Sequence, residues 1–180
     1  RIMKAPWQMS RTAIMVEAAV MEALSFVLSL IPFVQLPLGG SVTCFSPLPF
    51  TMMRLRHNAK CAFATATVYG LLQMFQGMGS VVIAGSALAM VGCALLDYVL
   101  AYACIGFTGA IARRFGGGTA GVAAGIIATG LIRLACSFLS GIIIWRAWAP
   151  AGMPVWWYSL TYNAGWCLPD VAVVLVAALL

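Results

Sequence analysis

Apolar segments long enough to cross a lipid bilayer follow one another along almost the whole chain, and this pattern excludes most soluble folds. A membrane-spanning helix needs about 20 consecutive apolar residues. Of the 180 residues, 63% are hydrophobic and only 8% are charged, whereas about a quarter of a soluble domain is charged. A soluble core of this size cannot hide so much apolar surface. The sequence therefore predicts an all-α membrane protein with lipid as its main solvent.

Proline and glycine clusters divide the chain into six predicted transmembrane helices. Examples are Pro32, the PLGG turn at 37–40 and the GGG at 116–118. There is no convincing internal repeat, so a single integral membrane domain over 1–180 is expected, and its ends are compatible with truncation on both sides. The predicted helices are 12–32, 36–54, 59–76, 80–112, 118–146 and 157–180.

Lysine and arginine residues fall on alternate connections, which places them on one side of the membrane. By the positive-inside rule this side, with both chain termini, is cytoplasmic. Arg146 lies at the opposite edge. The net charge of +6 then follows from topology, and it does not indicate nucleic-acid binding. The basic residues on the predicted cytoplasmic side are Arg1, Lys4, Arg11, Arg54, Arg56, Lys60, Arg113 and Arg114.

The cysteines carry no signature of metal or redox chemistry. All six are scattered, without a C-x-x-C pair or a histidine cluster, so we expect small buried hydrophobic residues and no metal or cofactor. The chain also has no GxxxxGK[ST] sequence for binding the phosphates of ATP. An enzymatic activity is therefore not expected.

All of the acidic residues, Glu17, Glu22, Asp97 and Asp170, fall inside predicted helices. A carboxylate at mid-bilayer costs roughly 3 kcal/mol or more unless it is paired or wetted, so each marks a candidate functional site. Asp97 and Arg133 lie near the middle of neighbouring antiparallel helices. Two interpretations stay open: a structural Asp97–Arg133 ion pair, or an Asp97 that meets a polar or cationic ligand while Arg133 keeps it ionised. Glu22 is the other candidate partner of Arg133.

Polar side chains form stripes on the last two predicted helices. Arg133, Ser137 and Ser140 follow the i, i+4, i+7 spacing of one helix face, and Asn163 and Asp170, seven residues apart, also share a face. Asn163 offers a donor and an acceptor, which suits an aminopyrimidine edge or an amide. A hydrogen bond between helices is the alternative interpretation.

The segment 145–166 holds five of the chain's six tryptophans. An aromatic belt at the membrane surface explains the outer ones. It explains Trp145 and Tyr158 less well, because these bracket a Pro-Gly loop directly above the depth of Asp97. Aromatic faces stack on flat rings and attract cations by about 0.5–2 kcal/mol each. A cage for a flat or cationic ligand is therefore predicted here.

These features together resemble the thiamine-specific substrate-binding subunit (S component) of energy-coupling factor (ECF) vitamin transporters, from about Val16 to the C-terminus. The resemblance implies the S-component fold of six transmembrane helices with cytoplasmic termini, in the bacterial cell membrane. The segments that carry it are EAAVMEALSFVLSLIP, GGSVT at 39–43, LR at 55–56, GLLQMFQG at 70–77, LLDYVLAY, GIIIWRAW and YSLTYNAG.

The resemblance implies that Asp97, Tyr98, Trp145, Tyr158 and Asn163 line a thiamine pocket near the outer face. Asp97 would accept a hydrogen bond from the aminopyrimidine or balance the positive thiazolium charge. The sequence departs from the family in having aspartate where a glutamate is usual at this position.

The resemblance also implies partners. Ala19 and Ala23, a small-x-x-x-small pair, would face a transmembrane scaffold subunit, and two ATPase subunits would supply the energy. Arg133, Ser137 and Asp170 are candidate supporting residues, with Ser137 standing where the family has a pocket histidine.

The implied function is high-affinity binding and uptake of thiamine. An S component or a secondary transporter for a related vitamin or thiamine precursor is the alternative. A remoter one is an intramembrane aspartyl protease that uses Asp97 and Asp170 as a dyad, although LLDY and LPD do not match the YD and GxGD motifs of that class.

Overall fold

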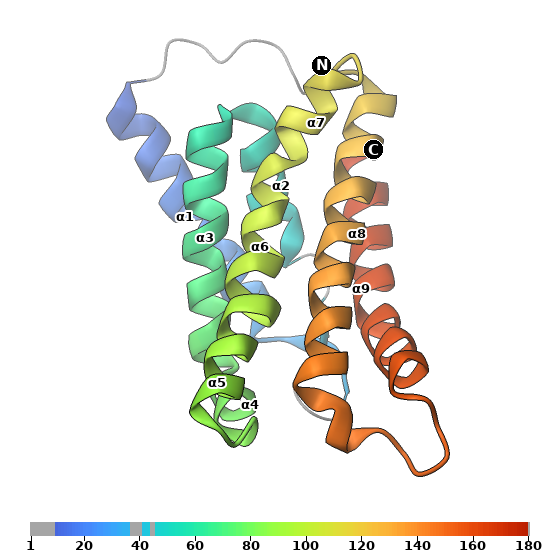
Figure 1. The fold of residues 1–180 in the computed structure, drawn as a ribbon. Helices are drawn as coiled ribbons and strands as arrows, with labels where there is room; N and C mark the ends of the chain where they lie inside the picture. The colour runs from blue at the N-terminus through green and yellow to red at the C-terminus, as the bar shows by residue number, and fades with distance from the viewer. Residues whose placement is uncertain (1–9, 37–40, 44–45, 180) are drawn as a thin grey trace.

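A computed structural model describes residues 10–36, 41–43 and 46–179, which form a helical bundle running between two ends of the molecule (Figure 1). The prediction of a mostly helical membrane protein is confirmed. Among the described residues, four helices are long and apolar enough to cross a membrane, against the six predicted. They are α1 (Arg11–Ser29), the continuous run Ala87–Arg114, α8 (Thr119–Ile143) and α9 (Val155–Leu179).

The predicted helix at 36–54 is wrong. Its place is taken by a short antiparallel hairpin of β1 (Pro32–Gln35) and β2 (Ser41–Thr43), followed by α2 (Pro47–Arg56). Proline at the first position of α2 starts a new helix there, since it lacks the N–H that continuation of an earlier one would need. Ten residues span about 15 Å, half of a bilayer core. The PLGG turn lies outside the described residues.

The third predicted helix matches α3 (Ala59–Gln76) in both bounds. The fourth is split by a turn at Gly85, whose φ of 88° is a left-handed conformation that favours glycine. The long helix beyond that turn is continuous but irregular, with a π-helical stretch in its middle. In order the remaining elements are α4 (Met78–Ile83), α5 (Ala87–Cys93), the π-helix η2 (Ala94–Leu100), α6 (Ala101–Ala103), the 3₁₀ helix η3 (Cys104–Phe107), α7 (Thr108–Arg114) and the 3₁₀ turn η4 (Trp145–Trp148).

The connections separate into two ends of the bundle. The start of α1, the α2–α3 connection and the α7–α8 connection lie together at the top of Figure 1, and the α4–α5 and α8–α9 connections lie at the bottom. The end of α9 is at the top as well. The basic connections of the sequence therefore share one end, whereas η4, with Arg146, lies at the other. This arrangement matches the predicted one-sided charge.

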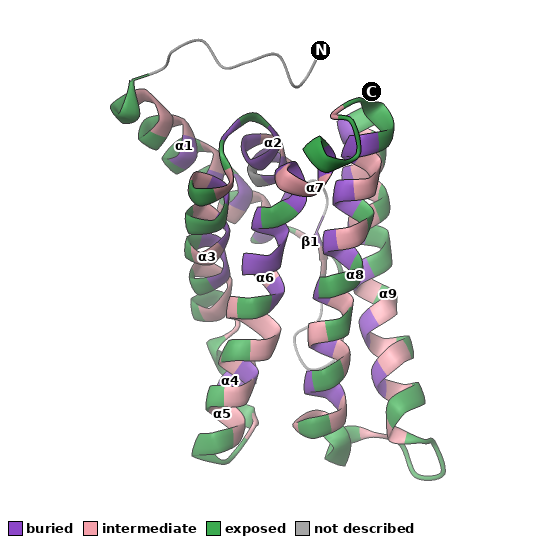
Figure 2. Ribbon diagram, turned by 45° about the horizontal axis from the view of Figure 1, so that its top comes forward, coloured by how far each residue is buried: buried purple, intermediate pink, exposed green. Residues whose placement is uncertain are grey.

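Figure 2 shows which faces of the helices are buried and which are exposed. Polar side chains are among the buried ones, whereas many large apolar side chains are exposed. On α8 the side chains of Arg133, Ser137 and Ser140 are buried, which confirms the predicted polar stripe. Ile132 and Leu139 on the same helix are exposed. A soluble bundle shows the opposite pattern, so the outward faces suit lipid.

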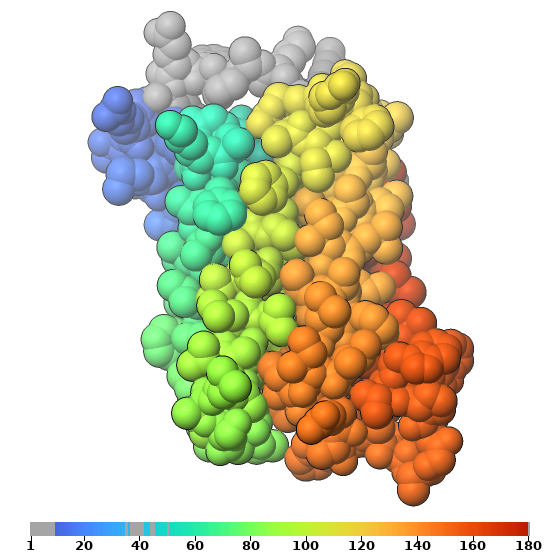
Figure 3. All heavy atoms as spheres, in the orientation of Figure 1, coloured from blue at the N-terminus to red at the C-terminus, as the bar shows by residue number. Residues whose placement is uncertain are grey.

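An apolar cluster packs α2, α7, α8 and α9 together. Figure 3 shows that the segment from α5 to α7 covers the face between α3 and α8. The prediction of buried cysteines is confirmed for three of the five in the described residues, whereas Cys61 and Cys136 are half-buried. All five are free thiols, and Cys44 lies outside the described residues. The cluster consists of Leu55, Ala112, Val122, Ile126, Val174 and Ala178.

Candidate functional site

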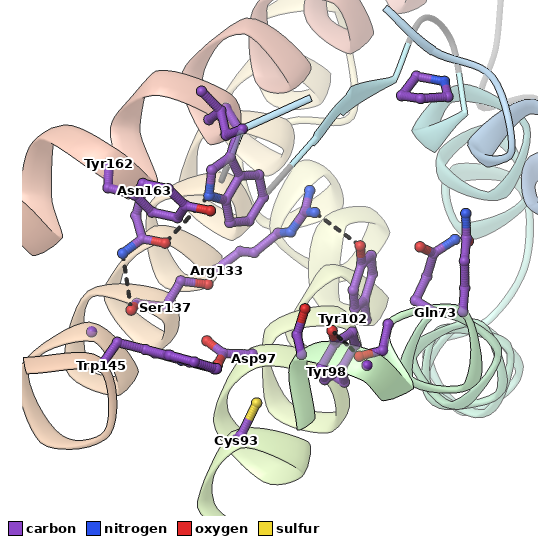
Figure 4. Close-up of a pocket in the computed structure, with 18 of the residues that line it drawn as sticks. Gln73, Cys93, Asp97, Tyr98, Tyr102, Arg133, Ser137, Trp145, Tyr162 and Asn163 are labelled. Atoms are coloured by element: carbon purple, nitrogen blue, oxygen red, sulfur yellow. Dashed lines mark hydrogen bonds between the residues drawn. The ribbon is translucent and has the colours of Figure 1, made fainter. Parts of the chain in front are cut away.

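A cavity of about 490 Å³ lies among the end of α1, α3, the π-helical segment, α8, η4 and α9 (Figure 4). This volume falls in the range of small-molecule sites, about 300–1,000 Å³. All five residues predicted to bind the ligand line it, as do Arg133 and Ser137. Asp170 lies behind Arg133 instead, beside a second and much smaller cavity. Side chains from distant parts of the sequence thus converge on one polar site.

Asp97 is held in the cavity wall by the π-helix η2. A π-helical turn is wider than an α-turn and is frequent at functional sites. The carboxylate oxygen Oδ2 accepts hydrogen bonds from Ser140 Oγ at 2.6 Å and from Trp145 Nε1 at 3.2 Å. No nitrogen or oxygen of the described chain donates to Oδ1. The Cys93 thiol, one turn earlier, is a further hydrogen-bond partner of Asp97. The described chain thus supplies Asp97 with neutral hydrogen-bond partners and with no cation.

Trp145 begins the 3₁₀ turn η4 that closes the end of α8. Because its indole N–H donates to Asp97, Trp145 can contact a ligand in the cavity only through the face of its ring. Tyr158, from the first turns of α9, lies against Tyr162 with the ring centroids 6.0 Å apart. Both tyrosines line the cavity, and together with Trp145 they give it an aromatic side.

Tyr98 follows Asp97 on η2 and reaches across to α3. Its hydroxyl donates to the backbone oxygen of Gly77 at 3.3 Å. A Cβ at Gly77 would overlap the Tyr98 hydroxyl, so only glycine leaves room for this contact. The last residue of the GLLQMFQG motif thus helps to set the position of a predicted ligand-binding residue.

Arg133 does not pair with Asp97 or Glu22, so both of the partners expected from the sequence are wrong. Arg133 Nη1 lies 3.5 Å from Asp170 Oδ2, and Nη2 donates to the Tyr102 hydroxyl at 3.0 Å. The guanidinium carbon is 4.6 Å from the ring centroids of both Tyr102 and Trp166. Two aromatic faces and one carboxylate therefore balance this buried cation at the floor of the cavity.

Glu22 pairs with Arg54 of α2, with 3.5 Å between Glu22 Oε1 and Arg54 Nη2. The Arg54 side chain is fully buried, whereas the sequence placed it in a loop. Glu17, one turn earlier on α1, bonds to Arg56 and His57. These pairs join α1 to α2 away from the cavity, and none of the three basic residues lines it.

Asn163 bonds to the neighbouring helix, as the alternative interpretation had it. Its Nδ2 donates to the backbone oxygens of Ser137 on α8 and Ser159 on α9, at 3.1 and 2.9 Å. Its Oδ1 accepts from Trp166 Nε1 at 3.3 Å and keeps one lone pair. Asn163 can thus offer a ligand only an acceptor without breaking these bonds.

The aspartyl dyad is not supported by this arrangement. Asp97 is bonded to Ser140 and Trp145, and Asp170 is paired with Arg133, so the two carboxylates have separate partners. A shared proton needs carboxylates in direct contact.

Sequence reasoning missed the α1–α3 side of the cavity. Ser29, Gln73 and Gln76 line it and are hydrogen-bonded to one another. The signal was present, because two glutamines three residues apart in an apolar helix are as unusual as the acids that were singled out.

Comparison with known proteins gives consistent matches. The sequence profile of the thiamine transporter protein family matches residues 15–180. The thiamine transporter ThiT of Bacillus subtilis is 30% identical over 167 residues, covering 87% of this chain and 83% of the relative. The ThiT of Lacticaseibacillus paracasei is 26% identical over 179 residues, covering 94% and 86%.

A solved structure of ThiT from Listeria monocytogenes has the same fold. Its TM-score is 0.74 at 23% sequence identity, and the match covers 93% of this chain and 92% of that one. The resemblance drawn from the sequence is confirmed. This chain, a multi-pass protein of the cell membrane, belongs to the thiamine transporter protein family.

Proposed function

We propose that this chain binds thiamine in the cavity and takes it into the cell as the S component of an ECF transporter. The observation that carries the proposal is a 490 Å³ cavity with a carboxylate and an aromatic side, in a chain of the thiamine transporter family. Thiamine has a flat aminopyrimidine and a permanently charged thiazolium ring. Aromatic faces suit the flat aminopyrimidine, and a carboxylate that has no cationic partner in the described chain suits the charged thiazolium ring.

Asp97 supplies the negative charge that balances the thiazolium ring. Its Oδ2 is held by Ser140 and Trp145, and its Oδ1 faces the ligand. Trp145 and Tyr158 stack on the ligand rings, and the remaining lone pair of Asn163 Oδ1 accepts from the exocyclic amine. Tyr98 contributes its ring, since its hydroxyl bonds to Gly77.

Assignment as an S component also implies which subunits the chain assembles with. As an S component the chain is a single domain over 1–180 with cytoplasmic termini and six helical segments within the membrane, of which α2 crosses only about half of the bilayer core. Ala19 and Ala23 are exposed on α1, where small side chains let another helix approach closely. They contact the transmembrane scaffold subunit, and two ATPase subunits hydrolyse ATP, so this chain has no enzymatic activity of its own.

A titration of the purified protein in detergent tests the ligand. Thiamine is expected to quench the tryptophan fluorescence saturably at a Kd below about 1 µM, while riboflavin and biotin have no effect. Trp145→Ala should remove most of the quenching, and Trp148→Ala, which alters an exposed tryptophan of the same turn, should not. A response to riboflavin or biotin instead would discard thiamine as the ligand. Silence to all three would discard the site.

A further inference from the structure

An amide cluster of Ser29, Gln73 and Gln76 forms the side of the cavity that α1 and α3 contribute. Gln73 Nε2 donates to Ser29 Oγ at 2.9 Å, and Ser29 Oγ lies 2.9 Å from Gln76 Oε1. Gln76 Nε2 donates back to the backbone oxygen of Ser29 at 3.2 Å. Three side chains and one backbone carbonyl thus fix one another in a polar patch within an apolar bundle.

One hydrogen-bond acceptor of the cluster, the side-chain oxygen of Gln73, has no donor within the cluster. Both ends of the Gln76 amide are bonded to Ser29, whereas Gln73 bonds to Ser29 only through its nitrogen. Within the described part of the chain no donor reaches Gln73 Oε1. An amide that is fixed at one atom and lines a cavity with the other is arranged to accept a hydrogen bond from an occupant.

The position of Gln73 suggests which part of the occupant it meets. In Figure 4, Trp145 and Asn163 lie on one side of the cavity, Asp97 and Tyr98 lie between, and Gln73 lies on the opposite side. Thiamine has the same linear order of groups: an aminopyrimidine, a cationic thiazolium ring, and an uncharged hydroxyethyl arm. With the thiazolium beside Asp97 and the pyrimidine among the aromatic residues, the arm extends toward Gln73.

We infer that Gln73 is a specificity-determining residue that accepts a hydrogen bond from the hydroxyl of the ligand, and that Ser29 and Gln76 position it. This inference rests on the proposed function. It assigns the uncharged end of the ligand to α3, a helix that none of the predicted binding residues belongs to. A ligand that ends in an apolar group would leave the Gln73 oxygen buried without a partner and would be rejected.

The test compares thiamine with an analogue whose hydroxyethyl arm is replaced by ethyl, by titration calorimetry on purified protein. The wild type should bind thiamine roughly tenfold more tightly than the analogue, the value of one well-placed hydrogen bond. Gln73→Met keeps the length of the side chain and removes the amide, so it should bind both equally. Gln73→Glu retains an acceptor oxygen and should keep the preference. Thr67→Val, at a half-buried position of the same helix outside the cavity lining, is the matched control and should behave as the wild type.

A purely structural role for Gln73 would weaken both ligands alike in Gln73→Met and preserve their ratio, and that result overturns the inference. So does a wild type that does not distinguish the two ligands. A wild type that binds neither compound contradicts the proposed function, and with it this inference, whereas loss of the hydroxyl preference alone would leave the proposed function standing.

Discussion

The two aspartates of the bundle have opposite environments. Asp170 is almost fully buried and pairs with Arg133, which is itself enclosed by Tyr102 and Trp166. Asp97 lines the cavity, and its hydrogen-bond partners in the described chain are neutral: a hydroxyl, an indole and the Cys93 thiol. No lysine, arginine or histidine of the described chain forms an ion pair with Asp97.

The difference separates an acid with a structural role from the acid that we propose binds the ligand. The charge of Asp170 is cancelled by its own chain, so it stabilises the floor of the cavity. The charge of Asp97 is stabilised by neutral hydrogen-bond donors and is not cancelled by a cation of the described chain, so a cation that enters the cavity is attracted to it more strongly than it would be in water. The depth of an acid in a membrane marks it as unusual, and its partners decide what it does.

The largest expected effect concerns the structural pair. Arg133→Leu or Asp170→Leu alone leaves one charge buried without a partner, which should cost about 3–5 kcal/mol of stability. The double variant removes both charges and should recover most of that loss. Thermal unfolding in detergent of the three variants measures it. Additive losses in the double variant would show that the two residues do not act as a pair.

A smaller effect is expected from a change beside Asp97 that leaves the carboxylate intact. Gly77→Ala introduces a methyl group where the Tyr98 hydroxyl lies, and relieving such an overlap costs about 1–3 kcal/mol. Because Tyr98 must move, thiamine affinity should fall by roughly tenfold. Gly79→Ala, which meets nothing within 4 Å, is the matched control in a titration of both variants. Equal affinities would mean that the position of Tyr98 does not matter for binding.

An effect of similar size on affinity is expected at one hydroxyl of α8, and a smaller one at another. Ser140→Ala removes the 2.6 Å hydrogen bond to Asp97 and should weaken thiamine binding by about tenfold, since a bond to a charged group contributes about 1.5 kcal/mol or more. The Ser137 hydroxyl makes no hydrogen bond within the described chain, so Ser137→Ala should change the affinity less. Parallel calorimetric titrations compare the two, and a larger loss for Ser137 would reassign the support of Asp97.

The sequence predicted which residues line the cavity better than it predicted which residues pair with one another. Helical spacing and the scarcity of charge identified Asp97, the stripe on α8 and the aromatic side, because these are properties of single segments. The ion-pair partner of Arg133 was not predicted, because the depth of a residue in the membrane and the helix face it lies on do not determine which helix packs against that face. Asp170 had been found on a polar face of α9, but its contact with α8 became evident only from the packing.

The second predicted helix was wrong and the amide cluster was not predicted, for different reasons. The apolar composition of 36–54 favoured a spanning helix, although Pro37, Pro47 and Pro49 lie within that range and proline interrupts a helix. Gln73 and Gln76 are neutral, so the scarcity of charge does not point to them, although an amide in lipid also needs a hydrogen-bond partner.

Calorimetric titration of Asp97→Asn with two ligands tests the central claim most directly: thiamine, and a neutral analogue in which the thiazolium ring is replaced by an uncharged ring of the same shape. Asparagine keeps the size and the hydrogen-bonding oxygen of aspartate and removes the charge. If Asp97 balances the thiazolium, the variant should bind thiamine about 30-fold or more weakly than the wild type does, with little change for the neutral analogue. An equal loss for both ligands, or no loss for thiamine, would contradict the assignment of Asp97 as the counter-charge of the ligand.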